Sequence, residues 1–249
     1  MFYLTIDTSM WIAVGVAVER DGEVRELSYQ LMRSNRMHAE ALAPMVKQVL
    51  SEAGIERPDA VVVGSGPGAF TGLRAGLMMA RTLARTWGIP LYGVSSLEVL
   101  ALAGADAGAQ EVVAMIDARR REVYALRARP MGADDVAILS PERIVAPADL
   151  HAELSREPAV VAAIDEVYPH VGVDTIGGRV AVEHRPVVMT RLALSHCARR
   201  AAGEDIDMGT QPHYLRRPDI HGGHPQPSQS QPAQSEVEQG EPNQSQPAS

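Results

Sequence analysis

The sequence has one cysteine and no long apolar run, and each shortage excludes a class of protein. The single Cys197 cannot form an intramolecular disulfide, which fits a reducing compartment. No apolar stretch is long enough to cross a bilayer, and no charged-then-apolar segment opens the chain as a secretory signal would. These shortages predict a cytoplasmic protein with no membrane contact.

Basic residues are also in the minority, because 23 Lys and Arg stand against 31 Asp and Glu and give a formal net charge of −8. Glu236, Glu238 and Glu241 supply −3 of this charge, which leaves about −5 for residues 1–220. Phosphate contacts need clustered Lys and Arg, so an acidic body is a poor nucleic-acid binder by itself. Any work on RNA would need a partner.

The usual catalytic patterns are missing as well. None of the eight histidines is paired at the i, i+4 spacing of a helical zinc site. There is no Gly-x-Ser-x-Gly turn, and Cys197 has no base beside it that the sequence reveals. We therefore predict no catalytic residue and no metal site.

A glycine-rich turn at residues 64–74 is the most distinctive stretch that is present. It joins a short apolar strand to an amphipathic helix over residues 72–87, which Thr71 would cap and Gly88 would end. Gly66, Pro67 and Gly68 allow close backbone approach, so the turn can present N–H groups to an anion. The spacing matches neither the dinucleotide fingerprint nor the phosphate loop, which favours a purely structural turn.

The chain opens with three predicted antiparallel strands over residues 2–7, 11–18 and 24–30, and Asp21-Gly22 marks the second hairpin. Asp7, Thr8 and Ser9 form the first turn and make up one polar trio. Two interpretations of this trio carry equal weight. It either holds a metal-bound phosphate or satisfies backbone groups of the turn.

Two predicted helices present apolar stripes. The first, over residues 37–53, contains Pro44, which should kink it or shift its start. Its wide, Met-rich face suits core packing and also suits adaptable contacts with a partner. The helix at residues 72–87 carries Arg74, Met78, Arg81 and Arg85 on the face away from the core, a solvated face or a partner surface.

The second half of the chain repeats the opening of the first. After a predicted boundary at residues 104–110, strands over 112–116 and 122–129 enclose a turn with Asp117 at a strand end. Arg119, Arg120 and Arg121 in this turn could contact RNA phosphate, although a solvated turn is favoured. A short helix over residues 147–154, a strand over 159–164 and a helix over 189–202 follow.

Residues 218–249 form a Gln-, Ser- and Pro-rich tail. It holds too little apolar surface to offset its ordering entropy, so we predict that it is disordered.

Six motifs in this order resemble the bacterial TsaB family over residues 1–217. They are Ile6-Asp7-Thr8-Ser9; residues 38–50 with Pro44; Gly64-x-Gly66-Pro67-Gly68-x-Phe70-Thr71-Gly72-Leu73-Arg74; Gly93-Val94-Ser95-Ser96-Leu97; Asp117-Ala118-Arg119 before Glu122-Val123-Tyr124; and Pro212-x-Tyr214-Leu215-Arg216. The Gly-Pro-Gly segment is the most specific of them.

The resemblance implies an α/β fold of two stacked halves, 1–103 and 104–217, of the actin-like, sugar-kinase and Hsp70-type ATPase superfamily, with mixed sheets flanked by helices. It implies a non-catalytic subunit that binds the transferase TsaD, which modifies the adenosine following a tRNA anticodon. The ATPase TsaE would join the assembly, tRNA would bind only through the complex, and the chain alone would form a homodimer.

The resemblance also implies site residues. The first two helices would form the partner surface, with His38, Leu42, Met45, Val46, Val49, Arg74, Met78 and Arg81. Vestigial phosphate-type loops would consist of Asp7, Thr8, Ser9, Gly66, Pro67 and Gly68. No cofactor of the chain's own is implied, and ATP or ADP at the partner interface stays open. The alternative is a free-standing ATP-dependent phosphotransferase that uses Asp7 and the Gly66–Gly68 loop.

Overall fold

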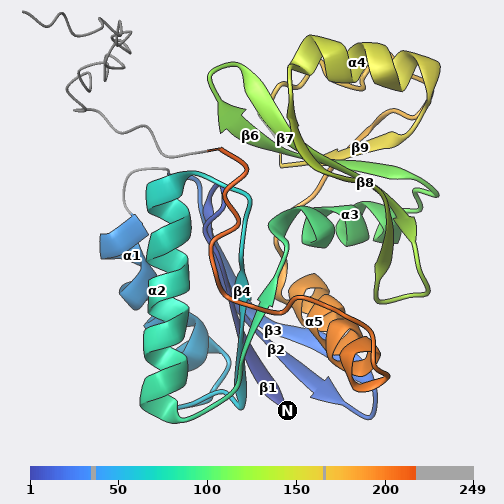
Figure 1. Cartoon of the computed structure of the whole chain (residues 1–249). Coiled ribbons are helices and arrows are strands. Elements are labelled where there is room, and N and C mark those ends of the chain that lie inside the picture. Colours follow the sequence, from blue (N-terminus) through green and yellow to red (C-terminus); the bar gives the residue numbers. More distant parts are fainter. Residues whose placement is uncertain (35–37, 165–166, 217–249) are drawn as a thin grey trace, which may run out of the picture. The chain divides into compact units, whose positions relative to one another are not determined.

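The structure, a computed structural model, describes residues 1–34, 38–164 and 167–216, with the backbone alone at residues 38 and 39. These residues belong to one compact unit, residues 1–217, which is built on two separate five-stranded sheets (Figure 1). The predicted disordered tail lies outside the described residues. None of the described helices combines the length and the apolar character needed to cross a bilayer.

The first sheet has the strand order β3-β2-β1-β4-β5. Its central strand β1 pairs antiparallel with β2 on one side and parallel with β4 on the other. The strands are β1 (Phe2–Asp7), β2 (Ile12–Arg20), β3 (Glu23–Met32), β4 (Ala60–Gly64) and β5 (Leu91–Val94).

Helices cover both faces of this sheet. Alternate residues of β1 face opposite sides, so Leu4 and Ile6 pack against α1 (His38–Glu52) and α2 (Phe70–Trp87). Tyr3 and Val62 belong instead to a second core that includes α5 (Pro186–Ala201). Figure 1 shows α1 and α2 together on one side of the strands and α5 on the other.

The second sheet, of order β10-β9-β6-β7-β8, repeats this plan. Val113 and Met115 of β6 pack with Leu150 and Leu154 of α4 on one face, and Ile116 packs with α3 on the other. Its elements are α3 (Ser96–Asp106), β6 (Val112–Arg119), β7 (Glu122–Pro130), β8 (Val136–Val145), α4 (Pro147–Arg156), β9 (Val160–Ala163) and β10 (Arg179–Ala181).

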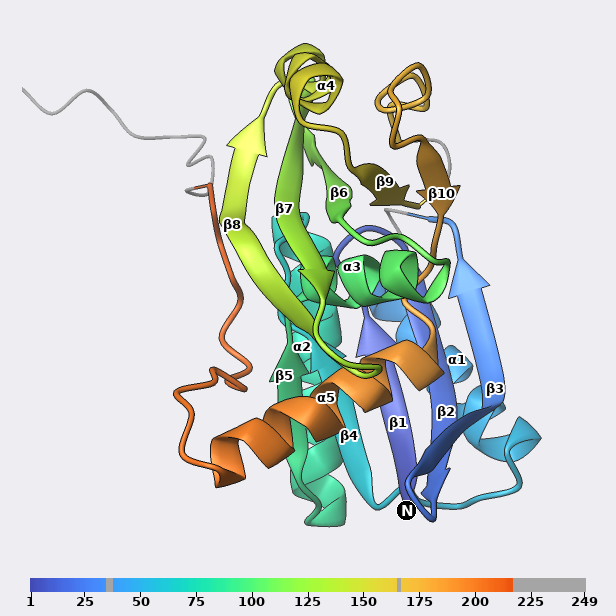
Figure 2. The same ribbon diagram turned by 90° about the vertical axis from the view of Figure 1, so that its right-hand side faces the viewer.

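The two helices α3 and α5 join the halves. The predicted boundary at residue 104 separates the sheets, but α3 runs on to Asp106 and packs against β6, β7 and β9 of the second sheet. Helix α5, late in the chain, packs against β1, β2 and β3 of the first sheet. Figure 2 shows α3 and α5 as neighbours, and one hydrophobic core includes residues of both.

The start of α2 differs from the prediction, whereas its end and the start of α1 agree with it. Helix α2 begins at Phe70 with Ala69 at its N-cap, and no side chain caps it, so the predicted Thr71 cap is wrong. Gly88 ends α2 in the left-handed conformation, as predicted. Pro44 lies within α1, which begins close to the predicted start, so the proline does not shift it.

Candidate functional site

The polar trio at the end of β1 forms a closed turn. Asp7 is fully buried, and its Oδ1 accepts hydrogen bonds from the backbone N of Ser9 at 2.9 Å and from its hydroxyl at 2.6 Å. The other carboxylate oxygen accepts from the Ser96 hydroxyl at 2.6 Å. His184, also buried, places Nδ1 3.7 Å from Oδ1 of Asp7. Asp7 therefore satisfies this turn and ties β1 to α3.

The glycine-rich turn packs directly on that trio. A Cβ added to Gly68 would stand 2.5 Å from Cα of Ser9, and one on Gly64 would overlap the Asp7 carboxylate. The backbone N of Ala69, at the start of α2, donates to the Ser9 carbonyl at 3.2 Å. Glycine is needed at residue 68 because backbone meets backbone there, and at residue 64 because the Asp7 carboxylate fills the space of a Cβ.

The six residues predicted to bind a phosphate lie close together, and the polar groups of Asp7 and Ser9 form hydrogen bonds within the protein. They are Asp7, Thr8, Ser9, Gly66, Pro67 and Gly68, and all six are buried. The N–H of Ala69 that could meet an anion already has a partner. Of the two interpretations of the polar trio, the geometry fits the turn that satisfies its own backbone.

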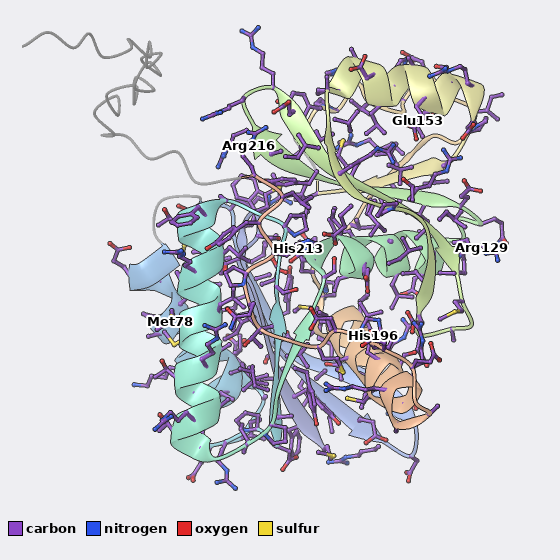
Figure 3. All side chains as sticks on the ribbon, in the orientation of Figure 1. Met78, Arg129, Glu153, His196, His213 and Arg216 are labelled. Atoms are coloured by element: carbon purple, nitrogen blue, oxygen red, sulfur yellow. The ribbon has the colours of Figure 1, made fainter. Side chains whose placement is uncertain are left out.

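The outer face of α2 is the most distinctive surface of this half. Phe70 and Tyr214 stack with ring centroids 5.1 Å apart, and the Arg74 guanidinium lies 3.8 Å above the Phe70 ring. Arg74 Nε also donates to the Tyr214 hydroxyl at 2.6 Å. Met78 follows one turn later, 58% exposed, and Figure 3 shows it pointing away from the sheet.

The C-terminal segment 207–216 is fastened beside this face. Arg81 of α2 donates to the hydroxyl and the carbonyl of Thr210. The N of Gly93 donates to the Met208 carbonyl at 2.9 Å, and the N of His213 donates to the Ser65 carbonyl at 2.8 Å. These bonds hold Tyr214 in place over Phe70, so a residue far along the chain completes the surface of α2.

Only part of the predicted partner surface is exposed. Arg74 and Met78 are exposed, and Arg81 is half-buried. The four predicted α1 residues are instead buried between α1 and the first sheet, so the structure corrects the prediction that they form a contact surface. They are Leu42, Met45, Val46 and Val49. The side chain of His38 lies outside the described residues.

A buried polar cluster between α3, α5 and β8 was not predicted from the sequence. Nε2 of His196 lies 3.4 Å from Oε2 of Glu98 and 3.6 Å from Oδ1 of Asp135. Glu142 of β8 accepts from the Ser95 hydroxyl and lies 2.6 Å from Nδ1 of His213. Figure 3 shows His196 on α5 and His213 on the C-terminal segment. The cluster borders a cavity of about 490 Å3.

The pKa values of two carboxylates in this cluster shift in opposite directions. Desolvation raises the pKa of Glu98 to about 7, although the nearby His196 opposes this shift. Burial also acts to raise the pKa of Asp135, but hydrogen bonds from His196, Ser195, Val136 N and Arg199 outweigh it and lower that pKa to about 2. Within the described ranges, no three His, Cys, Asp or Glu side chains are arranged to hold a metal ion.

The sequence matches a family model described as "TsaD: tRNA N6-adenosine threonylcarbamoyltransferase" over residues 32–169, more than half of the chain. An uncharacterised protein of Mycobacterium tuberculosis is 43% identical over 123 residues, which cover 49% of this chain and 56% of that protein. The Escherichia coli protein named tRNA threonylcarbamoyladenosine biosynthesis protein TsaB is 40% identical over 127 residues, 50% of this chain and 53% of that protein. The chain spans about half the length of these curated relatives.

Solved structures extend the similarity over most of the chain. YeaZ from Pseudomonas aeruginosa has a TM-score of 0.65 at 28% identity, and the match covers 80% of this chain and 93% of that one. A second P. aeruginosa structure, titled as similar to peptidase YEAZ, has a TM-score of 0.66 at 28% identity over 86% of this chain and 99% of that one.

Proposed function

The chain belongs to the family of tRNA N6-adenosine threonylcarbamoyltransferase, as a TsaB-type member with the actin-like ATPase fold, and from that premise we propose that it is a non-catalytic subunit. It binds a TsaD-type transferase and supports threonylcarbamoyl transfer from threonylcarbamoyl-AMP to the adenosine that follows the anticodon of tRNA. The name of the E. coli relative, a tRNA threonylcarbamoyladenosine biosynthesis protein, supports this role.

The observation that carries the proposal is the outer face of α2. An exposed Met78 beside a stacked Phe70, Arg74 and Tyr214 offers the residue types that contribute most to protein interfaces, Tyr and Arg above all. Methionine adapts its shape to different partners. The same face serves a homodimer when the transferase is absent, and the ATPase TsaE joins the larger assembly.

The closed junction around Asp7 supports a subunit without phosphoryl chemistry of its own. A free-standing phosphotransferase would need Asp7 and the Gly66–Gly68 loop to face a phosphate, whereas Asp7 is buried and bonded to Ser9 and Ser96. No observation favours that alternative. ATP or ADP at the partner interface stays a prediction.

The test is charge placed on the outer face of α2. Met78→Glu should weaken binding to a purified TsaD-type transferase about 30-fold or more, since a hot-spot loss is roughly 2 kcal/mol or greater. Binding is measured by calorimetry. Leu139→Glu is the matched control, because Leu139 is 45% exposed on β8, in the other sheet, and should leave affinity unchanged. Equal affinities for Met78→Glu and the unaltered chain would refute this interface.

A further inference from the structure

The turn between β6 and β7 holds three consecutive arginines in a disfavoured backbone conformation. Arg119, Arg120 and Arg121 have φ angles of 63°, 53° and 62°, all in the left-handed region that favours glycine and asparagine. All three are exposed at the hairpin tip. The equivalent β1–β2 turn of the first half holds Asp7, Thr8 and Ser9, and the β2–β3 hairpin turns on Asp21-Gly22. Arginine does not favour this backbone conformation. We therefore explain the three arginines by their charge and not by the geometry of the turn.

Nearby groups fix the conformation of the tip. Asp117 Oδ1 accepts from the backbone N of Arg119 at 2.8 Å, and its other oxygen pairs with the Arg119 guanidinium at 3.3 Å. Arg216, from the C-terminal segment, donates to the Ala118 carbonyl at 3.0 Å and pairs with Glu122. Glu122 is therefore neutralised from outside the hairpin.

A cavity of about 430 Å3 adjoins the tip and has aromatic walls. Trp11, Tyr168 and His170 line it together with Arg119, and Asp117 is the one carboxylate among the described lining residues. Tyr168 and His170 meet edge to face with centroids 6.2 Å apart. Nε1 of Trp11 is shielded from solvent and has no hydrogen-bond partner among the described residues.

Backbone strain gathers at the same place. Of the five described non-glycine residues with positive φ, Arg119 and Tyr168 line this cavity, and Arg120 and Arg121 follow Arg119 in the hairpin tip. Strained residues of this kind concentrate at ligand sites, where the surrounding structure holds them. Aromatic rings beside guanidinium groups form the surface on which unstacked RNA bases and backbone phosphates bind.

We propose that the β6–β7 tip and this cavity contact single-stranded RNA directly, with backbone phosphates on the arginines and a base against the aromatic walls. The inference rests on the proposed function, since the RNA is then the tRNA of the complex. The acidic body keeps this contact weak in the isolated chain, and the transferase beside it raises the affinity for tRNA. The site adds one local contact to the tRNA binding that the complex provides as a whole.

The test compares two pairs of arginines in the complex with a TsaD-type transferase. Arg120→Gly with Arg121→Asn removes two charges and retains the turn, because both new residues accept left-handed backbone. Arg20→Gln with Arg25→Gln removes two exposed charges at the β2–β3 hairpin. Binding of a labelled, unmodified tRNA transcript is titrated at several salt concentrations.

The tip variant should bind tRNA at least about fivefold more weakly, and the slope of log affinity against log salt should fall by about 1 to 2. The control pair should match the unaltered complex. Equal affinity and slope for the tip variant, or equal losses in both variants, would overturn the proposal. Light scattering on each complex separates this result from failure of the proposed function, which would show as no complex at all.

A second readout needs no transferase. Trp87→Phe leaves Trp11 as the only tryptophan of the chain. A single-stranded oligonucleotide of anticodon-loop sequence should quench its fluorescence, and Tyr168→Leu should weaken the quenching. Quenching by free ATP without quenching by the oligonucleotide would assign the cavity to a nucleotide and overturn the RNA site. No quenching by either probe would also count against it.

Discussion

Glu98 and Asp135 have pKa values shifted in opposite directions, because hydrogen bonds offset the effect of burial only at Asp135. Asp135 accepts from Val136 N and from the Ser195 hydroxyl at 2.7 Å, and from Arg199 at 3.0 Å. Glu98 is nearly as enclosed but has His196 alone as a close cationic partner at 3.4 Å. Asp135 therefore favours its charged form, whereas burial disfavours the charged form of Glu98.

This difference predicts a pH-dependent effect of Glu98→Gln. Between pH 4.5, the ordinary pKa of Glu, and about 7, folded Glu98 keeps a proton that the unfolded chain releases. The free energy of unfolding therefore falls as pH rises through this window. Glutamine cannot ionise, so relative to the unaltered protein the variant should gain about 2 to 3 kcal/mol between pH 5 and pH 8.

Urea unfolding at the two pH values measures this gain. Glu56→Gln, at an exposed position, is the matched control and should show no such change with pH. An identical stability difference for Glu98→Gln at pH 5 and pH 8 would contradict the role given to burial.

At the residue scale, sequence reasoning succeeded where partners are close along the chain. The Asp7–Ser9 turn, one of the two interpretations of the polar trio, follows from a spacing of two residues. Arg74 and Tyr214 are 140 positions apart, and Glu142 and Ser95 are 47 apart. Nothing in a single sequence specifies such pairs, so the polar cluster and the aromatic stack were missed.

At the element scale, periodicity predicted helices better than it predicted which face is free. The Met-rich stripe of α1 has the spacing of a core face and equally that of an interface. The structure buries it: Met45 is 5% exposed, against 58% for Met78. In α2 the apolar stripe of Leu73 and Leu77 already fills the core, so only its opposite face was open to a partner.

Strands β8 and β10 were not predicted for physical reasons. Pro141 and its charged neighbours interrupt the alternation of β8, and β8 pairs with β7 through register shifts. β10 has three residues, too few for a pattern. Strands β1, β2, β4, β6 and β9, with buried β-branched runs, were predicted within two or three residues of their ends.

The packing of α2 on the first turn gives a prediction for Gly76. A Cβ at this position would overlap the Thr8 hydroxyl, so α2 lies close to the β1–β2 turn only because residue 76 is glycine. Gly76→Ala should destabilise the protein by about 1 to 3 kcal/mol, although alanine favours helix by about 1 kcal/mol.

Thermal unfolding of the Gly76→Ala variant and of a double variant measures this contact. Thr8→Ala combined with Gly76→Ala should recover most of the loss, because it removes the overlapping group. A Gly76→Ala protein as stable as the unaltered one would show that α2 does not depend on this contact.

At the scale of the whole molecule, the two halves are repeats of one plan. The second sheet read from β8 to β10 has the same order as the first sheet read from β3 to β5, with the hairpins β1–β2 and β6–β7 in equivalent places. The repeated opening in the sequence predicted this likeness. The crossing of α3 and α5 to the opposite sheets was not predictable, because both helices have ordinary apolar stripes.

The plan also explains why a superfamily built around a nucleotide cleft can supply a binding subunit. The first hairpin and the glycine-rich turn, which would face a phosphate, fill each other's space at Ser9 and Gly68. The surfaces left for function are the outer face of α2 and the tip of the second hairpin. We infer that the fold here presents surfaces to partners.

The measurement that tests this account most directly is the molar mass of the chain with and without a TsaD-type transferase, by size-exclusion chromatography with light scattering. The chain of 26.8 kDa should run as a homodimer alone and exchange into a one-to-one heterodimer when mixed. Met78→Glu should reduce both species. A mixture that keeps the masses of its separate components would contradict the subunit proposal.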